Sequence, residues 1–147
     1  MALLILSKDI VRVEDTLSCV TLVAYKKGLK LNLEEYRDFE SRTNAEVYIS
    51  RHYEEEEDFY LGIESENNVI KDYNVLNIEV KGHRFYRIAV SDQASYDHLI
   101  YDFSLEYLRL RPDHCISLYG EIFFFLDDME SLESKGGYYK GWCYKPL

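Results

Sequence analysis

The sequence contains few of the residues that break regular structure. Its 147 residues include only two prolines, Pro112 and Pro146, and seven glycines. No stretch is low in complexity, so the composition predicts neither a flexible linker nor a long disordered tail. A chain of this length supports one hydrophobic core, and we expect a single domain over residues 1–147.

Cysteine and long apolar runs are also scarce. Cys19, Cys115 and Cys143 have neither the even count of a disulfide scaffold nor a C-x-x-C spacing, so we expect reduced and mostly buried thiols. The apolar start of the chain ends at Leu6, which is too short for a secretory signal or a membrane span and predicts a buried strand. The expected location is the cytosol, without membrane association.

Basic residues are fewer than acidic residues in this sequence. The chain has 17 basic and 27 acidic residues, which gives a formal net charge of −10. Nucleic-acid binding depends on lysine and arginine to neutralise phosphates, so direct binding to nucleic acid or to an anionic membrane is disfavoured. An acidic composition also serves solubility alone, and it does not specify a function by itself.

No catalytic or cofactor motif is found. The sequence lacks G-x-S-x-G, G-x-x-x-x-G-K-[ST], G-x-G-x-x-G and H-E-x-x-H, and its histidines do not cluster at metal-ligand spacing. We therefore predict no cofactor, no metal and no catalytic residue. An enzyme that uses carboxylates alone would leave no such pattern, so an enzyme stays open as an alternative.

The periodicity of apolar residues predicts an α+β fold. We expect an antiparallel hairpin sheet of about 5–6 strands, including a short pair over residues 115–119 and 121–126. One face is covered by a long helix near residues 93–110, whose apolar stripe includes Leu99, Phe103 and Tyr107 and whose polar side includes Tyr101. Shorter helices are predicted near residues 15–27, 33–40 and 127–134. Residues 15–27 contain a β-branched run that would also suit a strand, and the aromatic segment after Gly137 is either docked or free.

Two hairpins account for the middle of the chain. In the first, apolar residues alternate from Val47 to Tyr53 and from Phe59 to Ile63. Placing both sets on one face pairs Tyr53 with Phe59, and by the same register Ile49 with Ile63. The acidic run Glu54–Asp58 is then a solvated loop, where mutual repulsion costs least. A second hairpin is predicted around a three-residue loop, Lys81-Gly82-His83.

The function that this composition favours is an immunity or antitoxin protein that neutralises a basic partner, most concretely a nuclease toxin. Tyrosine is abundant, at 14 of 147 residues, and tyrosine is favoured at protein interfaces for its area, its hydroxyl and its low rotamer entropy. Carboxylates would mimic phosphates and steer association. For steering, the predicted partner-binding residues are Glu54, Glu55, Glu56, Glu57 and Asp58. A secondary patch is predicted from Tyr53, Tyr60, Asp127, Asp128 and Glu130.

Two alternatives come from other classes. A small enzyme or ligand-binding domain would have its pocket between the long helix and the sheet, using His98, Asp102 or His114. His98 and Asp102 are four positions apart on one helix face, a spacing that is also typical of a surface pair. Asp113, His114 and Cys115 are successive and would point to opposite faces, so they are not expected to converge. The third class is a structural or adaptor module.

Overall fold

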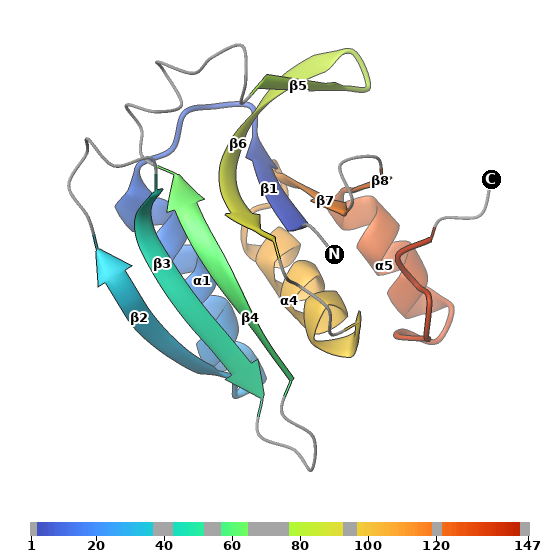
Figure 1. Ribbon diagram of the computed structural model, residues 1–147. Coiled ribbons are helices and arrows are strands. Elements are labelled where there is room, and N and C mark those ends of the chain that lie inside the picture. The colour runs from blue at the N-terminus through green and yellow to red at the C-terminus, as the bar shows by residue number, and fades with distance from the viewer. Residues whose placement is uncertain are drawn as a thin grey trace.

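The computed structural model describes residues 3–36, 43–51, 57–64, 77–92, 97–118 and 122–144. They form an eight-stranded antiparallel sheet, with helices α1 and α4 behind it and α5 beside α4 (Figure 1). The strands are β1 Leu3–Ser7, β2 Lys30–Tyr36, β3 Thr43–Arg51, β4 Glu57–Glu64, β5 Asn77–Val80, β6 His83–Ser91, β7 Cys115–Leu118 and β8 Ile122–Phe124. The described helices are α1 Val13–Lys27, α4 Asp97–Leu110 and α5 Leu126–Ser134.

The predicted α+β class is confirmed, and the sheet is larger than predicted. Its order is β2-β3-β4-β6-β1-β7-β8, with β5 paired to β6. The apolar start of the chain forms the central strand β1, which pairs with β6 and β7 and is buried throughout. The predicted pair near Gly120 is confirmed as β7 and β8. No helix in the described parts of the chain has the length and apolar content that crossing a bilayer requires.

The predicted helix near residues 33–40 is wrong where the structure describes it, because Lys30–Tyr36 form strand β2. Asn32 followed by Glu34 and Glu35 imitates the start of a helix. Leu31 and Leu33 instead pair with Ile49 and Val47 of β3, and this cross-strand burial outweighs a weak local preference. Residues 37–40 lie outside the described residues.

The first hairpin is confirmed, but its predicted register is wrong. Ile49 faces Phe59, and Arg51 faces Glu57, so Ile49 does not pair with Ile63. The two apolar sets do share one buried face, as the alternation predicted. Glu57 and Asp58 therefore belong to β4, while residues 52–56 between the strands lie outside the described residues.

The second hairpin has a tighter turn than predicted. Val80 faces His83, so the connection is the two-residue turn Lys81-Gly82. Both residues have positive φ, 51° and 77°, as a type I′ turn requires to match the twist of the strands. In this register Phe85 faces Ile78, and Phe85 is buried.

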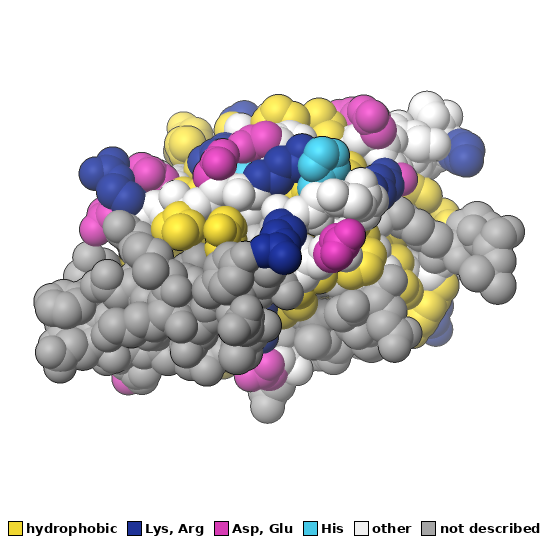
Figure 2. Space-filling model, turned by 90° about the horizontal axis from the view of Figure 1, so that it is seen from above, with side chains coloured by type: hydrophobic (Ala, Val, Ile, Leu, Met, Phe, Trp, Pro, Cys, Tyr) yellow, Lys and Arg dark blue, Asp and Glu magenta, His cyan; other side chains and the backbone are white. Residues whose placement is uncertain are grey.

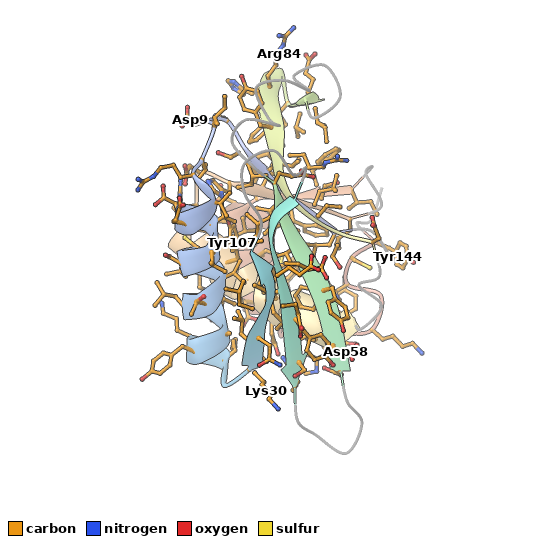
Figure 3. All side chains as sticks on the ribbon, turned by 60° about the vertical axis from the view of Figure 1, so that its left-hand side comes forward. Asp9, Lys30, Asp58, Arg84, Tyr107 and Tyr144 are labelled. Carbon is orange, nitrogen blue, oxygen red and sulfur yellow. The ribbon has the colours of Figure 1, made fainter. Side chains whose placement is uncertain are left out.

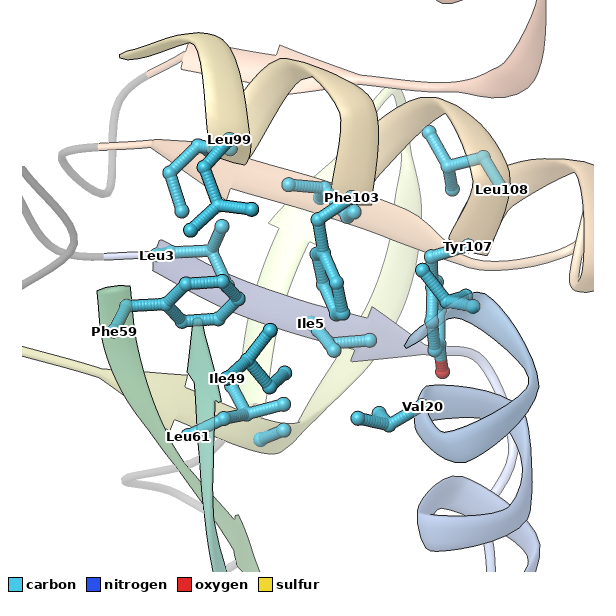
Figure 4. Close-up of a cluster of buried hydrophobic side chains, with 14 of the residues drawn as sticks. Leu3, Ile5, Val20, Ile49, Phe59, Leu61, Leu99, Phe103, Tyr107 and Leu108 are labelled. Carbon is cyan, nitrogen blue, oxygen red and sulfur yellow. The ribbon is translucent and has the colours of Figure 1, made fainter. Parts of the chain in front are cut away.

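Helix α1 and helix α4 form the core with the inner face of the sheet (Figure 4). Residues 15–27 are helical, as predicted, and α1 ends at Gly28, whose φ of 64° is accessible to glycine at little cost. It begins at Val13, two residues before the predicted start, and Arg12 before it makes no side-chain cap.

Helix α4 buries the predicted stripe of Leu99, Phe103 and Tyr107. Tyr101, predicted on the polar side, is also buried, because α5 and the C-terminal segment cover that side. Residues 93–96 of the predicted long helix lie outside the described residues. Trp142 and Cys143 are buried, so the described part of the C-terminal segment is docked on the body.

Candidate functional site

The outer face of the sheet, which points away from the helices, has two different halves. Over β1, β6 and β7 it is apolar and buried, because the β5–β6 hairpin contributes to a second hydrophobic cluster there. That cluster comprises Leu4, Leu6, Val80, Phe85 and Cys115. Over β2, β3 and β4 the outer face is mostly polar, and its tyrosines are exposed or half-buried.

Two tyrosines and one carboxylate form the centre of this polar half. Tyr48 of β3 faces Tyr60 of β4, with ring centroids 4.8 Å apart and an interplanar angle of 39°. The Tyr48 hydroxyl donates a hydrogen bond of 2.6 Å to Oδ2 of Asp58. Tyr60 remains 49% exposed. We call Tyr48, Asp58 and Tyr60 the tyrosine face.

The tyrosine face follows from strand alternation. Val47, Ile49, Phe59 and Leu61 are buried inward, so the residues between them point outward. Tyr60 and Asp58 were predicted as partner-binding residues, whereas Tyr48 was missed. The same alternation could have identified Tyr48, because it lies between two inward residues of its strand.

Glu57 lies on the other side of the sheet from Asp58. It faces Arg51, which is 6% exposed and whose Nη1 is 3.5 Å from Glu57 Oε2. Nη2 of Arg51 donates a hydrogen bond to Oδ2 of Asp102 on α4. The buried guanidinium thus joins the hairpin to the helix. Glu57 is held in an ion pair with this guanidinium and lies on the face opposite to Asp58.

The predicted His98–Asp102 pair is confirmed as a neighbour pair. His98 Nε2 is 3.6 Å from Asp102 Oδ2, and the imidazole stacks on Tyr138 with centroids 4.1 Å apart. Asp102 is shared with Arg51, and the ring face of His98 is covered by the C-terminal segment. Both groups therefore have structural contacts that fix them in place.

The structure does not bring the predicted acidic residues of α5 to the tyrosine face. Helix α5 packs beside β8 and α4, at the edge of the sheet far from β2. Asp128 accepts a hydrogen bond from the backbone N–H of Phe125, and Glu130 pairs with Arg109 at 2.9 Å. Hydrogen bonding to Arg109 holds the pKa of Glu130 below its ordinary value. Asp127 is exposed, while Tyr53 and Glu54, Glu55 and Glu56 lie outside the described residues.

His114 lies in a separate, fully buried place. Its Nδ1 is 2.9 Å from the hydroxyl of Tyr107, and its Nε2 is 3.9 Å from Oδ2 of Asp113. Burial, assisted by the charge of Arg111, lowers the pKa of His114 to about 4. Cys115 belongs to the cluster on the outer face, so Asp113, His114 and Cys115 do not converge, as predicted. The described residues include no group of three or more potential metal ligands.

No protein-family model, curated protein or solved structure matches this chain. Its function is therefore inferred from the chemistry of its surfaces.

The charges of the described side chains bear on which surface could bind a protein partner. Among the described residues, the end of the molecule seen in Figure 2 presents both basic and acidic side chains. Asp58 lies at the hairpin end of β4, next in the chain to the run Glu54–Glu57 (Figure 3). Lys30 lies at the neighbouring end of β2 and adds one positive charge on the same side. The tyrosine face thus combines aromatic area with a carboxylate that already accepts a hydrogen bond, an arrangement suited to a protein partner that donates further ones.

Proposed function

We propose that this protein is an immunity- or antitoxin-type inhibitor that binds a basic protein partner, a nuclease toxin, and occupies its nucleic-acid cleft. The observation that supports the proposal most is the tyrosine face, in which a pair of contacting tyrosines and Asp58 lie together on an exposed half of the sheet. The net charge of −10 favours a basic partner over an acidic one.

The tyrosines would provide the centre of the contact. Tyr60 is half-exposed and already positioned by Tyr48, so little side-chain entropy is lost when a partner covers it. A tyrosine ring also offers apolar area together with a hydroxyl, which is why tyrosine is frequent among the residues that dominate binding energy.

Asp58 would provide the polar contact. A carboxylate accepts several hydrogen bonds, so Asp58 can receive one from an arginine or lysine of the toxin while it keeps the one from Tyr48. In this role it takes the place of a phosphate of the nucleic acid. The other carboxylates of the chain would attract the basic partner over a longer distance. This attraction raises the association rate and is weakened by salt.

The alternative, a small enzyme or ligand-binding domain, has less support. Asp102 is bound by Arg51, His98 is stacked on Tyr138, and His114 is fully buried. Each of these three residues is therefore either buried or already in contact with another side chain.

The test is inhibition of a basic nuclease domain, which is to be sought among the proteins encoded next to this gene. The purified wild-type protein is expected to block cleavage of DNA or RNA by that domain at equimolar ratio. Asp58→Lys should raise the inhibitory constant by about 30-fold or more, since it replaces an attractive contact by a repulsive one. Glu79→Lys is the matched control, because Glu79 is exposed on β5 in the other hairpin and the change in net charge is the same.

Equal inhibition by both charge variants would contradict the assignment of the surface. A neighbouring protein that binds this chain but keeps full nuclease activity would contradict the inhibitory function.

A further inference from the structure

Strand β2 is an edge of the sheet. Among the described residues it pairs with β3 alone, and it stands first in the strand order. An edge strand presents backbone N–H and C=O groups that can pair with another strand. Leu33 adds apolar surface at this edge, since it is 50% exposed although it points to the inner side with Leu31.

The faces of the side chains on β2 follow from its register with β3. Leu31 and Leu33 pair with the buried residues Ile49 and Val47, so they lie on the inner face. Lys30 and Asn32 pair with Ser50 and Tyr48 and lie on the outer face. The regular stretch ends at Leu33, because Leu33 faces Val47 and Glu35 faces Glu46, so Glu34 is the extra residue of a bulge and has no facing residue in β3.

The sequence of β2 complements itself in one antiparallel register. When a two-fold axis passes through Asn32, Leu31 faces Leu33 of the second copy and Lys30 faces Glu34 of the second copy. The apolar contact and the ion pair are each made twice, as two-fold symmetry requires.

Neighbouring registers lose this match. Centring the axis on Leu31 places Lys30 against Asn32, and centring it on Leu33 places Asn32 against Glu34. Centring it on Lys30 or on Glu34 places a charge against itself. The charges of β2 therefore select the register centred on Asn32.

We propose that two copies of this chain associate through β2, antiparallel and centred on Asn32, so that one sheet continues across the dimer. The inference depends on β2 alone and is independent of the proposed inhibitory function. Because the axis is perpendicular to the sheet, the outer faces of both copies lie on the same side. Asn32 is the β2 neighbour of Tyr48, so the dimer would present two tyrosine faces side by side.

The test is sedimentation velocity of the full chain over a wide range of concentration. The wild type is expected to show a concentration-dependent dimer. Lys30→Glu and Glu34→Lys should each weaken the dimer about tenfold or more, since each places like charges in contact twice. The matched controls are Lys140→Glu and Glu79→Lys, both at exposed positions outside β2. Circular dichroism checks that every variant is folded.

Mixing the two β2 variants gives the decisive result. In a mixed pair, one contact joins the two substituted positions with their charges exchanged, and the other contact keeps the original Lys30 and Glu34. Both contacts then join opposite charges, so an equimolar mixture of Lys30→Glu and Glu34→Lys should dimerise as the wild type does.

Three results would overturn the proposal. The first is a wild-type protein that stays monomeric, and the second is a mixture of the two variants that does not recover the dimer. The third is a dimer that persists in both single variants, which would place the interface elsewhere.

Discussion

His114 is expected to make the stability of the fold depend on pH. It is fully buried, and its Nδ1 is in hydrogen-bond contact with the hydroxyl of Tyr107. The charged groups that act on it are Arg111, Asp113 and Asp9. Burial and Arg111 lower its pKa from 6.5 to about 4, against the smaller opposing effects of Asp113 and Asp9. The folded protein therefore holds this imidazole neutral at pH 7.

The sign and the size of the effect follow from linkage. The unfolded chain protonates this histidine near pH 6.5 and the folded chain only near pH 4, so the unfolded state binds more protons between these values. The contribution of His114 to the free energy of unfolding is complete above pH 6.5 and decreases as the pH falls toward 4. The pKa difference corresponds to about 3 kcal/mol.

Urea unfolding at a series of pH values measures this contribution. Relative to the wild type, His114→Gln should lose about 1–2 kcal/mol at pH 7, where the contact with Tyr107 is weakened, but it should show a flatter decline toward pH 4. His83→Gln is the matched control, since His83 is exposed, and should keep the wild-type decline. If wild type and His114→Gln declined in parallel, the buried neutral state of His114 would be refuted.

Three further substitutions test the packing that positions the surface. Asp102→Ala leaves the buried Arg51 with one carboxylate fewer and should cost about 2–3 kcal/mol in urea unfolding; a cost near zero would show that Arg51 does not need Asp102. Trp142→Ala removes a buried indole that contacts Tyr101 edge-on at 5.1 Å and should cost about 3–5 kcal/mol, with a change in near-ultraviolet dichroism. An unchanged melting temperature would contradict the docking of the C-terminal segment. Gly28→Ala should cost about 1 kcal/mol in thermal unfolding, because φ is 64° and the added Cβ would meet no atom beyond its chain neighbours within 4 Å, so backbone strain acts alone. A stabilised variant would contradict this account.

Strand faces could be predicted from the sequence, whereas strand registers could not. Alternation placed Val47, Ile49 and Phe59 on one face, and the structure agrees. Any shift by an even number of residues keeps that alternation, so the pattern could not distinguish Phe59 facing Tyr53 from Phe59 facing Ile49. The register decides whether Glu57 and Asp58 belong to a loop or to a strand.

Contacts between residues far apart in the sequence could not be predicted from the pattern, for a different reason. Arg51 and Asp102 are 51 positions apart, and nothing local to either residue indicates their contact. Local signals were also ambiguous for β2, where Asn32 and the glutamates after it are typical of a helix start. Pairing with β3 determined the outcome, and pairing is a property of the whole fold. Within the tyrosine face, Asp58 and Tyr60 were predicted, and Tyr48 could have been.

The most direct test of the binding surface is calorimetric titration of wild type, Tyr60→Ala and Tyr25→Ala into the basic nuclease domain that the inhibition test identifies. Both tyrosines are exposed, but Tyr60 lies on the tyrosine face and Tyr25 lies on α1, on the other side of the sheet. Tyr60→Ala is expected to raise Kd by about 30-fold, and Tyr25→Ala by less than about twofold. Equal affinities for the two variants, or a larger loss for Tyr25→Ala, would contradict the assignment of the tyrosine face as the partner-binding surface.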